Sequence, residues 1–384
     1  MNGRRVLLMS VMLACVVGLV TVAGAAAPLT NEEELGKMLF FDEDLSLNGN
    51  QSCATCHAPA VGWVGPDSAV NAAGAVYEGS VPGAFGDRKP PTAAYGGHSP
   101  VLYYDAIEEV WVGGMFWDGR ATGWVLGDPL AEQAKGPFLN PKEQALPSAE
   151  ALVEKVRMAS YAPLFEAVWG PGSLDDADSA YDLIGRSIAA YERSVEVSPY
   201  SSKYDAYLAG TAKLSGAERR GMDLFFGKAL CSACHNGADF TDFTYDNLGV
   251  PKNPMNPMYA EHPDFIDPGL GGFLKSTGYD EGVYQAEWGK HKVPSLRNVA
   301  MRPSPRGLSV KAYGHNGYFK SLKEIVHFYN TRDVMGAGWK GAPWPAAEYA
   351  DTVNVDELGD LGLTDREEDD LVAFMEALSD GWMP

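Results

Sequence analysis

Cysteine is scarce in this chain of 384 residues, which contains only five. Cys15 lies in an apolar run near the N-terminus, and the other four cysteines form two Cys-x-x-Cys-His motifs. The motifs are Cys53-Ala54-Thr55-Cys56-His57 and Cys231-Ser232-Ala233-Cys234-His235. This spacing is typical of covalent c-type haem attachment, in which both thiols bond to the porphyrin vinyl groups and the histidine ligates the iron.

Two other kinds of site use paired cysteines, namely a Cys₄ zinc site and a redox-active Cys-x-x-Cys pair. Zinc-binding pairs seldom lie as far apart as these two motifs, with a histidine directly behind each pair. The sequence therefore favours two haems. One is held by Cys53, Cys56 and His57, and the other by Cys231, Cys234 and His235.

Long apolar segments are absent after residue 22, so no later stretch is long enough to cross a bilayer. Before it, two basic residues precede an apolar run over 6–22, which ends in Ala23-Gly24-Ala25. This order is typical of a secretory signal peptide. We expect a signal peptide over 1–25 and an exported, periplasmic protein without a membrane partner after cleavage. An uncleaved N-terminal anchor is the alternative.

Basic residues are also few, with 30 Lys and Arg against 51 Asp and Glu and a formal net charge of −21. An acidic protein of this kind is repelled by polyanions, so nucleic acid and anionic membranes are not expected partners. The charge can steer a basic redox protein to the surface, or it can serve solubility alone.

Strand patterns are short and scattered, whereas a helix-start signal recurs. The segment 29–41 is repeated as 214–226, and in each copy a Thr or Ser is followed three residues later by Glu. This is a capping box, and the haem cysteines follow each copy. A similar signal at Thr364 opens a helix suited to packing on a haem domain. We predict a mostly α-helical protein with two cytochrome c-like domains, 26–200 and 201–384, each with one covalent haem c.

Three further features complete the predicted organisation. An amphipathic helix is expected near 181–191, because its apolar residues recur at helical spacing. Residues 198–202 are expected to form the linker between the domains. Stretches rich in glycine and proline over 58–100 and 245–285 are expected to form loops.

Several motifs outside the haem sites resemble the bacterial di-haem cytochrome c peroxidase family, including its MauG-like branch, which oxidises protein side chains. They are Phe116-Trp117-Asp118-Gly119-Arg120-Ala121, Glu132-Gln133-Ala134, Asn140-Pro141-x-Glu143, Val293-Pro294-Ser295-Leu296-Arg297-Asn298 and His315-Asn316-Gly317. The resemblance covers nearly the whole mature chain. It implies reduction of hydrogen peroxide at the N-terminal haem, with electrons relayed through the C-terminal haem.

The resemblance implies an electron-donor cytochrome or copper protein as partner, or a protein substrate whose Trp or Tyr side chain is oxidised. A non-enzymatic di-haem electron-transfer cytochrome is the alternative from another class of protein. Such a carrier needs two closed irons, whereas an enzyme needs one iron with an open face.

Three residues are assigned catalytic roles by the resemblance. Glu143 matches the acid–base group above the peroxidatic haem, where a carboxylate can move a proton between the two oxygens of peroxide. Gln133 matches the group that holds peroxide by hydrogen bonds. Trp117 matches the tryptophan between the two haems, where an indole can relay an electron. For Glu143, a solvated helix-start carboxylate is the alternative, and for Trp117 a core aromatic.

In many family members a histidine ligand closes the resting peroxidatic haem. The matching stretch of this chain, between Ala58 and Gly97, contains no histidine. The N-terminal haem is therefore expected to rest open. His98 follows this gap and is interpreted as a loop histidine. The family's interdomain calcium is doubtful here, because Lys89 stands at the position of its Asn ligand and the Thr-x-Pro before His315 is not preserved.

The C-terminal iron needs a sixth ligand beyond His235. Candidates by side-chain chemistry are Met255, Met258, His291, His315, His327, Tyr329 and Met335. Register in the family favours Tyr329, which lies fourteen residues after His315, and His327 is its main rival. A thioether ligand suits electron uptake from a cytochrome, whereas a phenolate stabilises oxidised iron and suits storage of an oxidising equivalent.

Covalent haem should survive denaturation of the protein, because thioether bonds do not dissociate with the fold. Mass spectrometry of the exported, denatured protein should show two added haems and loss of residues 1–25. A mass that lacks both haems after export from a host with haem-attachment machinery would contradict the assignment of both motifs.

Overall fold

The computed structural model describes residues 27–302 and 309–383, so the predicted signal peptide over 1–25 lies outside the described residues. Within the described part the chain is mostly helical. Its longer helices are α1 (Asn31–Phe41), α4 (Pro129–Leu139), α5 (Ala149–Met158), α6 (Ala162–Trp169), α7 (Ala177–Arg193), α9 (Gly216–Phe225), α11 (Gly269–Ser276), α13 (Leu322–Thr331) and α14 (Asp365–Glu376). The shorter ones are α2 (Cys53–Cys56), α3 (Ser68–Ala72), α8 (Lys203–Leu208), α10 (Pro257–Glu261) and α12 (Glu281–Ala286).

The strands form short antiparallel pairs, as their scattered sequence patterns suggest. They are β1 (Tyr103–Asp105) with β2 (Val110–Val112), β3 (Tyr245–Asp246) with β4 (His291–Lys292), and β5 (Gly338–Trp339) with β6 (Ala342–Pro343). Among the described residues, no helix combines the length and apolar character needed to cross a membrane.

The predicted capping boxes are confirmed at the starts of α1, α9 and α14. At α1, the Thr30 hydroxyl accepts the Glu33 backbone N–H at 3.2 Å, and the Glu33 carboxylate accepts the Thr30 N–H at 2.7 Å. Each box satisfies backbone donors that a helix start otherwise leaves free. The predicted amphipathic helix near 181–191 is also confirmed and forms part of α7.

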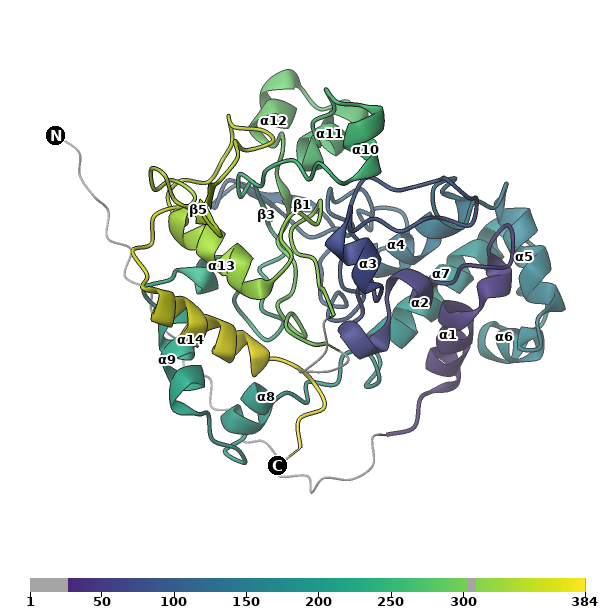
Figure 1. Cartoon of the computed structure of the whole chain (residues 1–384). Coiled ribbons are helices and arrows are strands. Elements are labelled where there is room, and N and C mark those ends of the chain that lie inside the picture. Colours follow the sequence, from purple (N-terminus) through teal and green to yellow (C-terminus); the bar gives the residue numbers. More distant parts are fainter. Residues whose placement is uncertain (1–26, 303–308, 384) are drawn as a thin grey trace.

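Two apolar cores lie on opposite sides of the molecule, and long loops run between them (Figure 1). The first core packs α1, α5 and α6 around α7. The second packs α9, α13 and α14 together. Each haem motif follows the first long helix of its own core, so the sequence repeat corresponds to a structural one.

A glycine of the repeat permits a close helix contact in each core. A Cβ atom placed at Gly36 of α1 would overlap the carbonyl oxygen of Ser187 on α7. One placed at Gly221 of α9 would overlap the carbonyl oxygen of Asp370 on α14. Backbones approach this closely only where a side chain is missing, which explains why glycine stands at the same place in both copies.

The expectation of plain loops is wrong over 245–285, where α10, α11 and α12 lie, and over part of 58–100, where α3 lies. Leu270 and Leu274, one helical turn apart on α11, are fully buried against Trp111 and Tyr245. Burial of this apolar face stabilises a helix whose glycines give it low intrinsic propensity. Burial against distant residues therefore outweighs the low helix propensity of the local sequence.

Gly221→Ala should lower the free energy of unfolding by about 1–3 kcal/mol, the usual range for overpacking, because α9 and α14 must separate. Gly216→Ala, at the exposed start of the same helix, should change it by less than about 0.5 kcal/mol. Denaturant unfolding of the haem-loaded protein, followed by circular dichroism, measures both. Equal stabilities of the two variants would contradict the close contact.

Candidate functional site

The first Cys-x-x-Cys-His motif lines a cavity in the N-terminal half. Cys53 and Cys56 belong to α2, and His57 ends it. The opposite walls come from α4, from the loop that follows it, and from α7. Lining residues with polar side chains are Gln51, Ser52, Thr92, Gln133, Glu143, Gln144 and Glu192.

Both motif histidines are oriented for iron ligation by one ring nitrogen. The Nδ1 atom of His57 lies 3.2 Å from the Trp63 carbonyl oxygen, and that of His235 lies 3.0 Å from the Phe240 carbonyl oxygen. A carbonyl partner fixes the tautomer with hydrogen on Nδ1 and leaves Nε2 for a metal. Burial lowers the pKa of His57 to about 4 and lowers that of His235, so both imidazoles are neutral ligands. Two thiols and one neutral imidazole at each cavity fit a haem.

The structure brings Gln133 and Glu143 into the same cavity as the first motif. Gln133 lies on α4, and Glu143 follows the end of that helix. The Glu143 carboxylate accepts a hydrogen bond from the Asn140 side-chain amide at 2.8 Å. Burial raises the pKa of Glu143 above its usual value, while Asn140 and the positive charge of Arg120 oppose the shift. Glu143 is therefore neither at a helix start nor fully solvated, and its catalytic role stays a prediction.

Sequence reasoning missed Glu192, which also lines this cavity from α7. Only 4% of this residue is exposed, and its Oε2 atom has no hydrogen-bond partner among the described residues. Burial raises the pKa of Glu192 to about 8. The signal was present in the sequence, because Glu192 lies four residues after Ile188 and so places a charge on the apolar face of the helix.

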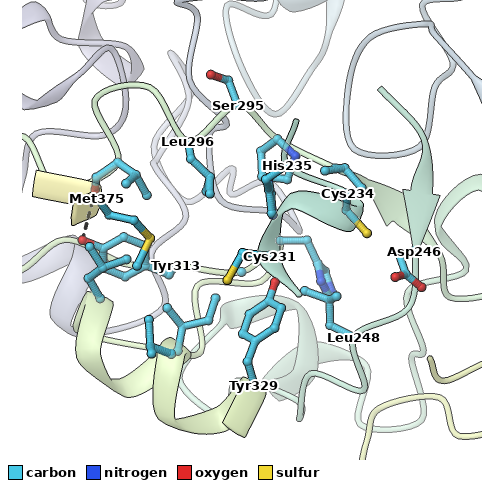
Figure 2. Close-up of a pocket in the computed structure, with 18 of the residues that line it drawn as sticks. Cys231, Cys234, His235, Asp246, Leu248, Ser295, Leu296, Tyr313, Tyr329 and Met375 are labelled. Atoms are coloured by element: carbon cyan, nitrogen blue, oxygen red, sulfur yellow. Dashed lines mark hydrogen bonds between the residues drawn. The ribbon is translucent and has the colours of Figure 1, made fainter. Parts of the chain in front are cut away.

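The second motif lines a larger cavity, shown in Figure 2. One face of α13 closes it, formed by Leu322, Ile325, Val326 and Tyr329 at helical spacing. The Tyr329 hydroxyl points into the cavity beside Cys231 (Figure 2). Burial raises the pKa of the phenol, so a phenolate here requires a cation such as ferric iron beside it. The position suits the predicted sixth ligand, and ligation stays a prediction.

The rival His327 lies on a different face of α13. Its Nδ1 atom is 2.8 Å from the Glu368 carboxylate on α14, and it is not among the lining residues. Met255 and Met335 are exposed to solvent. Met375 on α14 lines the cavity (Figure 2), a thioether that sequence reasoning did not consider.

Phe116 and Trp117 lie in the wall between the two cavities. Phe116 lines the first cavity and Trp117 the second, while Pro91 and Thr92 line both. The Trp117 indole N–H donates to the Lys89 carbonyl oxygen at 2.8 Å, which fixes the buried ring. This position suits an electron relay, and the role stays a prediction.

Of two other residues singled out in the sequence, His98 lies at the surface and Lys89 lines the second cavity. The His98 side chain is 69% exposed and its Nδ1 atom lies 2.8 Å from Asp239, so it occupies a surface position. The Lys89 ammonium donates to the Pro90 carbonyl oxygen at 2.9 Å. A positive charge at this position disfavours a second cation, and the expectation that calcium is doubtful here stays a prediction.

Two cavities, each lined by a Cys-x-x-Cys-His motif, define a di-haem protein. Residues 30–213 match the family model described as di-haem cytochrome c peroxidase. The methylamine utilization protein MauG of Paracoccus denitrificans is 37% identical over 365 residues, covering 90% of this chain and 88% of that protein. The cytochrome-c peroxidase IdrP1 of Denitromonas iodatirespirans is 32% identical over 374 residues, covering 92% of this chain and 82% of that protein.

A solved structure also places this chain among di-haem peroxidases. The diheme peroxidase BthA from Burkholderia thailandensis E264 superposes with a TM-score of 0.79 at 31% identity, covering 94% of this chain and 88% of that chain. The chain therefore belongs to the di-haem cytochrome c peroxidase family.

Tyr329→Phe should change the low-spin ferric EPR signal of the second haem, because the phenolate ligand is lost. Tyr329→Met should raise the potential of that haem, since a thioether favours ferrous iron. His327→Gln is the matched control on the same helix and should keep the wild-type signal. An unchanged spectrum in Tyr329→Phe would contradict ligation by Tyr329 and direct attention to Met375 or His327.

Proposed function

We propose that the protein is a periplasmic di-haem c-type peroxidase that reduces hydrogen peroxide at its N-terminal haem. Electrons reach that haem through the C-terminal haem from a small cytochrome or copper protein. One observation carries the proposal: Gln133 and Glu143 line the cavity of the first motif, whereas Tyr329 lines that of the second. The cavities thus differ as a reacting iron and a closed iron should differ.

The assignment of cofactors rests on the two motifs. Cys53 and Cys56 would attach the first haem and His57 would ligate it, while Cys231, Cys234 and His235 would do the same for the second. When bound, the haems supply irons that exchange electrons and, at an open position, bind peroxide. Their covalent attachment and export by a signal peptide over 1–25 are parts of the proposal, as are haem domains over 26–200 and 201–384.

The residues of the first cavity supply proton transfer and orientation. Glu143 would accept a proton from the inner oxygen of peroxide and return it to the outer oxygen, which leaves as water when the O–O bond breaks. Two electrons relayed from the donor, with two protons from solvent, would convert the inner oxygen to a second water. Asn140 holds the carboxylate through its side-chain amide, so the group is positioned before peroxide enters. Gln133 donates a hydrogen bond to peroxide and orients the outer oxygen toward Glu143.

Trp117 is proposed to relay charge across the wall. Its N–H donates to a backbone carbonyl, so the ring keeps one orientation and one hydrogen-bond partner during electron transfer. A fixed geometry reduces reorganisation, which favours rapid exchange between the two sites.

Peroxide-dependent oxidation of a Trp or Tyr side chain on a partner protein is the second candidate function. The position of Tyr329 favours it, because a phenolate stabilises oxidised iron and allows an oxidising equivalent to be stored. A protein of this kind reacts with peroxide from the fully ferric state. One that must first be half-reduced acts as a cytochrome peroxidase. A non-enzymatic carrier reacts in neither state.

Glu143→Gln should slow the reaction with peroxide by about 10²–10⁴-fold while haem content stays unchanged, because the proton shuttle is lost and side-chain size is kept. Stopped-flow spectroscopy of the Soret band measures the rate. In the wild type the rate should fall as the pH drops through the raised pKa of Glu143, since only the carboxylate accepts a proton.

The exposed Glu154 provides a matched control, and Glu154→Gln should react like the wild type. A wild-type rate and pH profile in Glu143→Gln would show that Glu143 takes no part in the reaction.

A further inference from the structure

A cluster of aromatic side chains outside both haem cavities reaches the surface at the β1–β2 hairpin. Tyr104 on β1 pairs with Trp111 on β2, and their ring centroids lie 5.6 Å apart. Tyr279, which follows α11, stands edge-on to the same indole at 5.4 Å. Trp111 is 5% exposed, whereas Tyr104 is 47% exposed and Tyr279 is 36% exposed. One buried indole is therefore in contact with two phenols that meet the solvent.

The buried end of this cluster reaches the loop that carries Trp117. Trp111 packs against Tyr245 in one small apolar core. The Tyr245 hydroxyl donates to the Gly113 carbonyl oxygen at 2.6 Å, and a Cβ atom placed at Gly119 would lie 2.4 Å from that hydroxyl oxygen. Gly113 and Gly119 flank Trp117 in the chain, so Tyr245 touches both Trp111 and the loop that holds Trp117.

The chain itself limits the distance between the two indoles. Trp117 comes six residues after Trp111, and an extended chain of that length spans at most about 20–22 Å. Positive φ angles at Gly113 and Gly114 bend this stretch, which shortens the separation further. Because electron-transfer rates fall steeply with distance, two short steps by way of Tyr245 are faster than one long step.

Trp111 is suited to pass on an electron without exchanging a proton. Its indole nitrogen is buried and has no hydrogen-bond partner among the described residues. An oxidised indole at this place keeps its proton, since no neighbouring group accepts it. The phenols of Tyr104 and Tyr279 meet water, which accepts the proton that an oxidised phenol loses. An indole radical cation is a stronger oxidant than a tyrosyl radical, so the oxidising equivalent moves outward to a tyrosine.

Acidic side chains surround the two exposed phenols. They are Asp105, Glu108 and Glu109 on the hairpin, and Asp280 and Glu281 directly after Tyr279. Neither 101–112 nor 276–286 contains a Lys or Arg. The ammonium of Lys275 on α11 lies over the rings of Tyr284 and Trp288, at 5.4 and 5.6 Å. A rim of one charge raises the local concentration of molecules of opposite charge, here cations.

We propose that Tyr104 and Tyr279 form a surface oxidation site, supplied through Trp111, for one-electron donors that carry positive charge. The inference rests on the proposed peroxidase function, which supplies hydrogen peroxide as the oxidant. Each phenol gives one electron inward and its proton to water, and the donor then returns the electron while water returns the proton. Two donors oxidised in this way, with two protons, complete the reduction of one peroxide to two waters. Such a donor needs no access to either cavity.

Radical trapping on the haem-loaded, ferric protein tests the path without any donor. Hydrogen peroxide is added with a nitroso spin trap, and peptide mass spectrometry locates the adducts, which we expect on Tyr104, Tyr279 or both. Tyr103 is an internal control, because it is 46% exposed but pairs with Val112 instead of Trp111. Labelling of Tyr103 that equals the stronger of the two expected signals, or no labelling of Tyr104 and Tyr279, would overturn the path.

Trp111→Phe should remove most of the label, while its Soret band responds to peroxide at the wild-type rate. Trp124→Phe is the matched control and should be labelled like the wild type, because this indole is 48% exposed and has Phe273 as its aromatic neighbour. A normal Soret response with undiminished label in Trp111→Phe contradicts the path alone. A wild type whose Soret band does not respond to peroxide contradicts the proposed function and the path together.

A cationic donor tests the site with variants at exposed positions only. The probe is (ferrocenylmethyl)trimethylammonium, whose peroxide-dependent oxidation is followed by absorbance. Tyr104→Phe/Tyr279→Phe should lose most of this activity, whereas Tyr103→Phe should keep it. A wild-type rate in the tyrosine double variant would overturn the site.

Glu108→Gln/Glu109→Gln should slow oxidation of this cation by about ten-fold at low ionic strength, the lower end of electrostatic steering, and should not slow the anion ferrocenecarboxylate. An unchanged rate with the cation in this variant would overturn the preference for positive charge.

Discussion

The buried guanidinium of Arg88 connects the two halves of the molecule, and the wall between the cavities depends on it. It donates to Asp118 at 2.6 Å and to the two oxygens of Asp267 at 2.7 Å each. Asp118 follows Trp117 directly, and Arg88 precedes the residue whose carbonyl accepts the indole N–H. Loss of one partner from a buried ion pair typically costs about 3–5 kcal/mol, because a charge is left uncompensated. This contact therefore holds the indole between the cavities.

The repeated sequence provides two similar haem attachments, and the residues outside the repeat make them different. α1 and α9 begin with the same capping box and pack through equivalent glycines. The segment with α4 brings Gln133 and Glu143 to the first cavity, whereas α13 brings Tyr329 to the second. In the proposed function, the carboxylate of the first cavity would serve proton transfer, and the phenol of the second would close an iron.

Features with a local cause could be predicted from the sequence. The capping boxes, α7 and the two motifs depend on residues close together in the chain. Helical spacing also places Tyr329 on the same face of α13 as Leu322, Ile325 and Val326, the face that lines the second cavity. His327 falls on another face.

Features that depend on tertiary contacts could not be predicted. α11 is stabilised by burial of Leu270 and Leu274 against distant aromatic residues, which a local pattern rich in glycine does not reveal. Asp267, His291 and His315 come together from separate segments, so no spacing in the sequence indicates that they are neighbours. Met375 reaches the second cavity only because α14 packs beside α13.

The central claim is that the resting protein has one open and one closed iron. A cyanide titration of the fully ferric protein, followed by EPR, tests it most directly. The account predicts that one cyanide binds for every two irons and converts a high-spin signal, while the low-spin signal of the second haem persists. A protein in which neither iron takes up cyanide would be a closed electron carrier and would contradict the account.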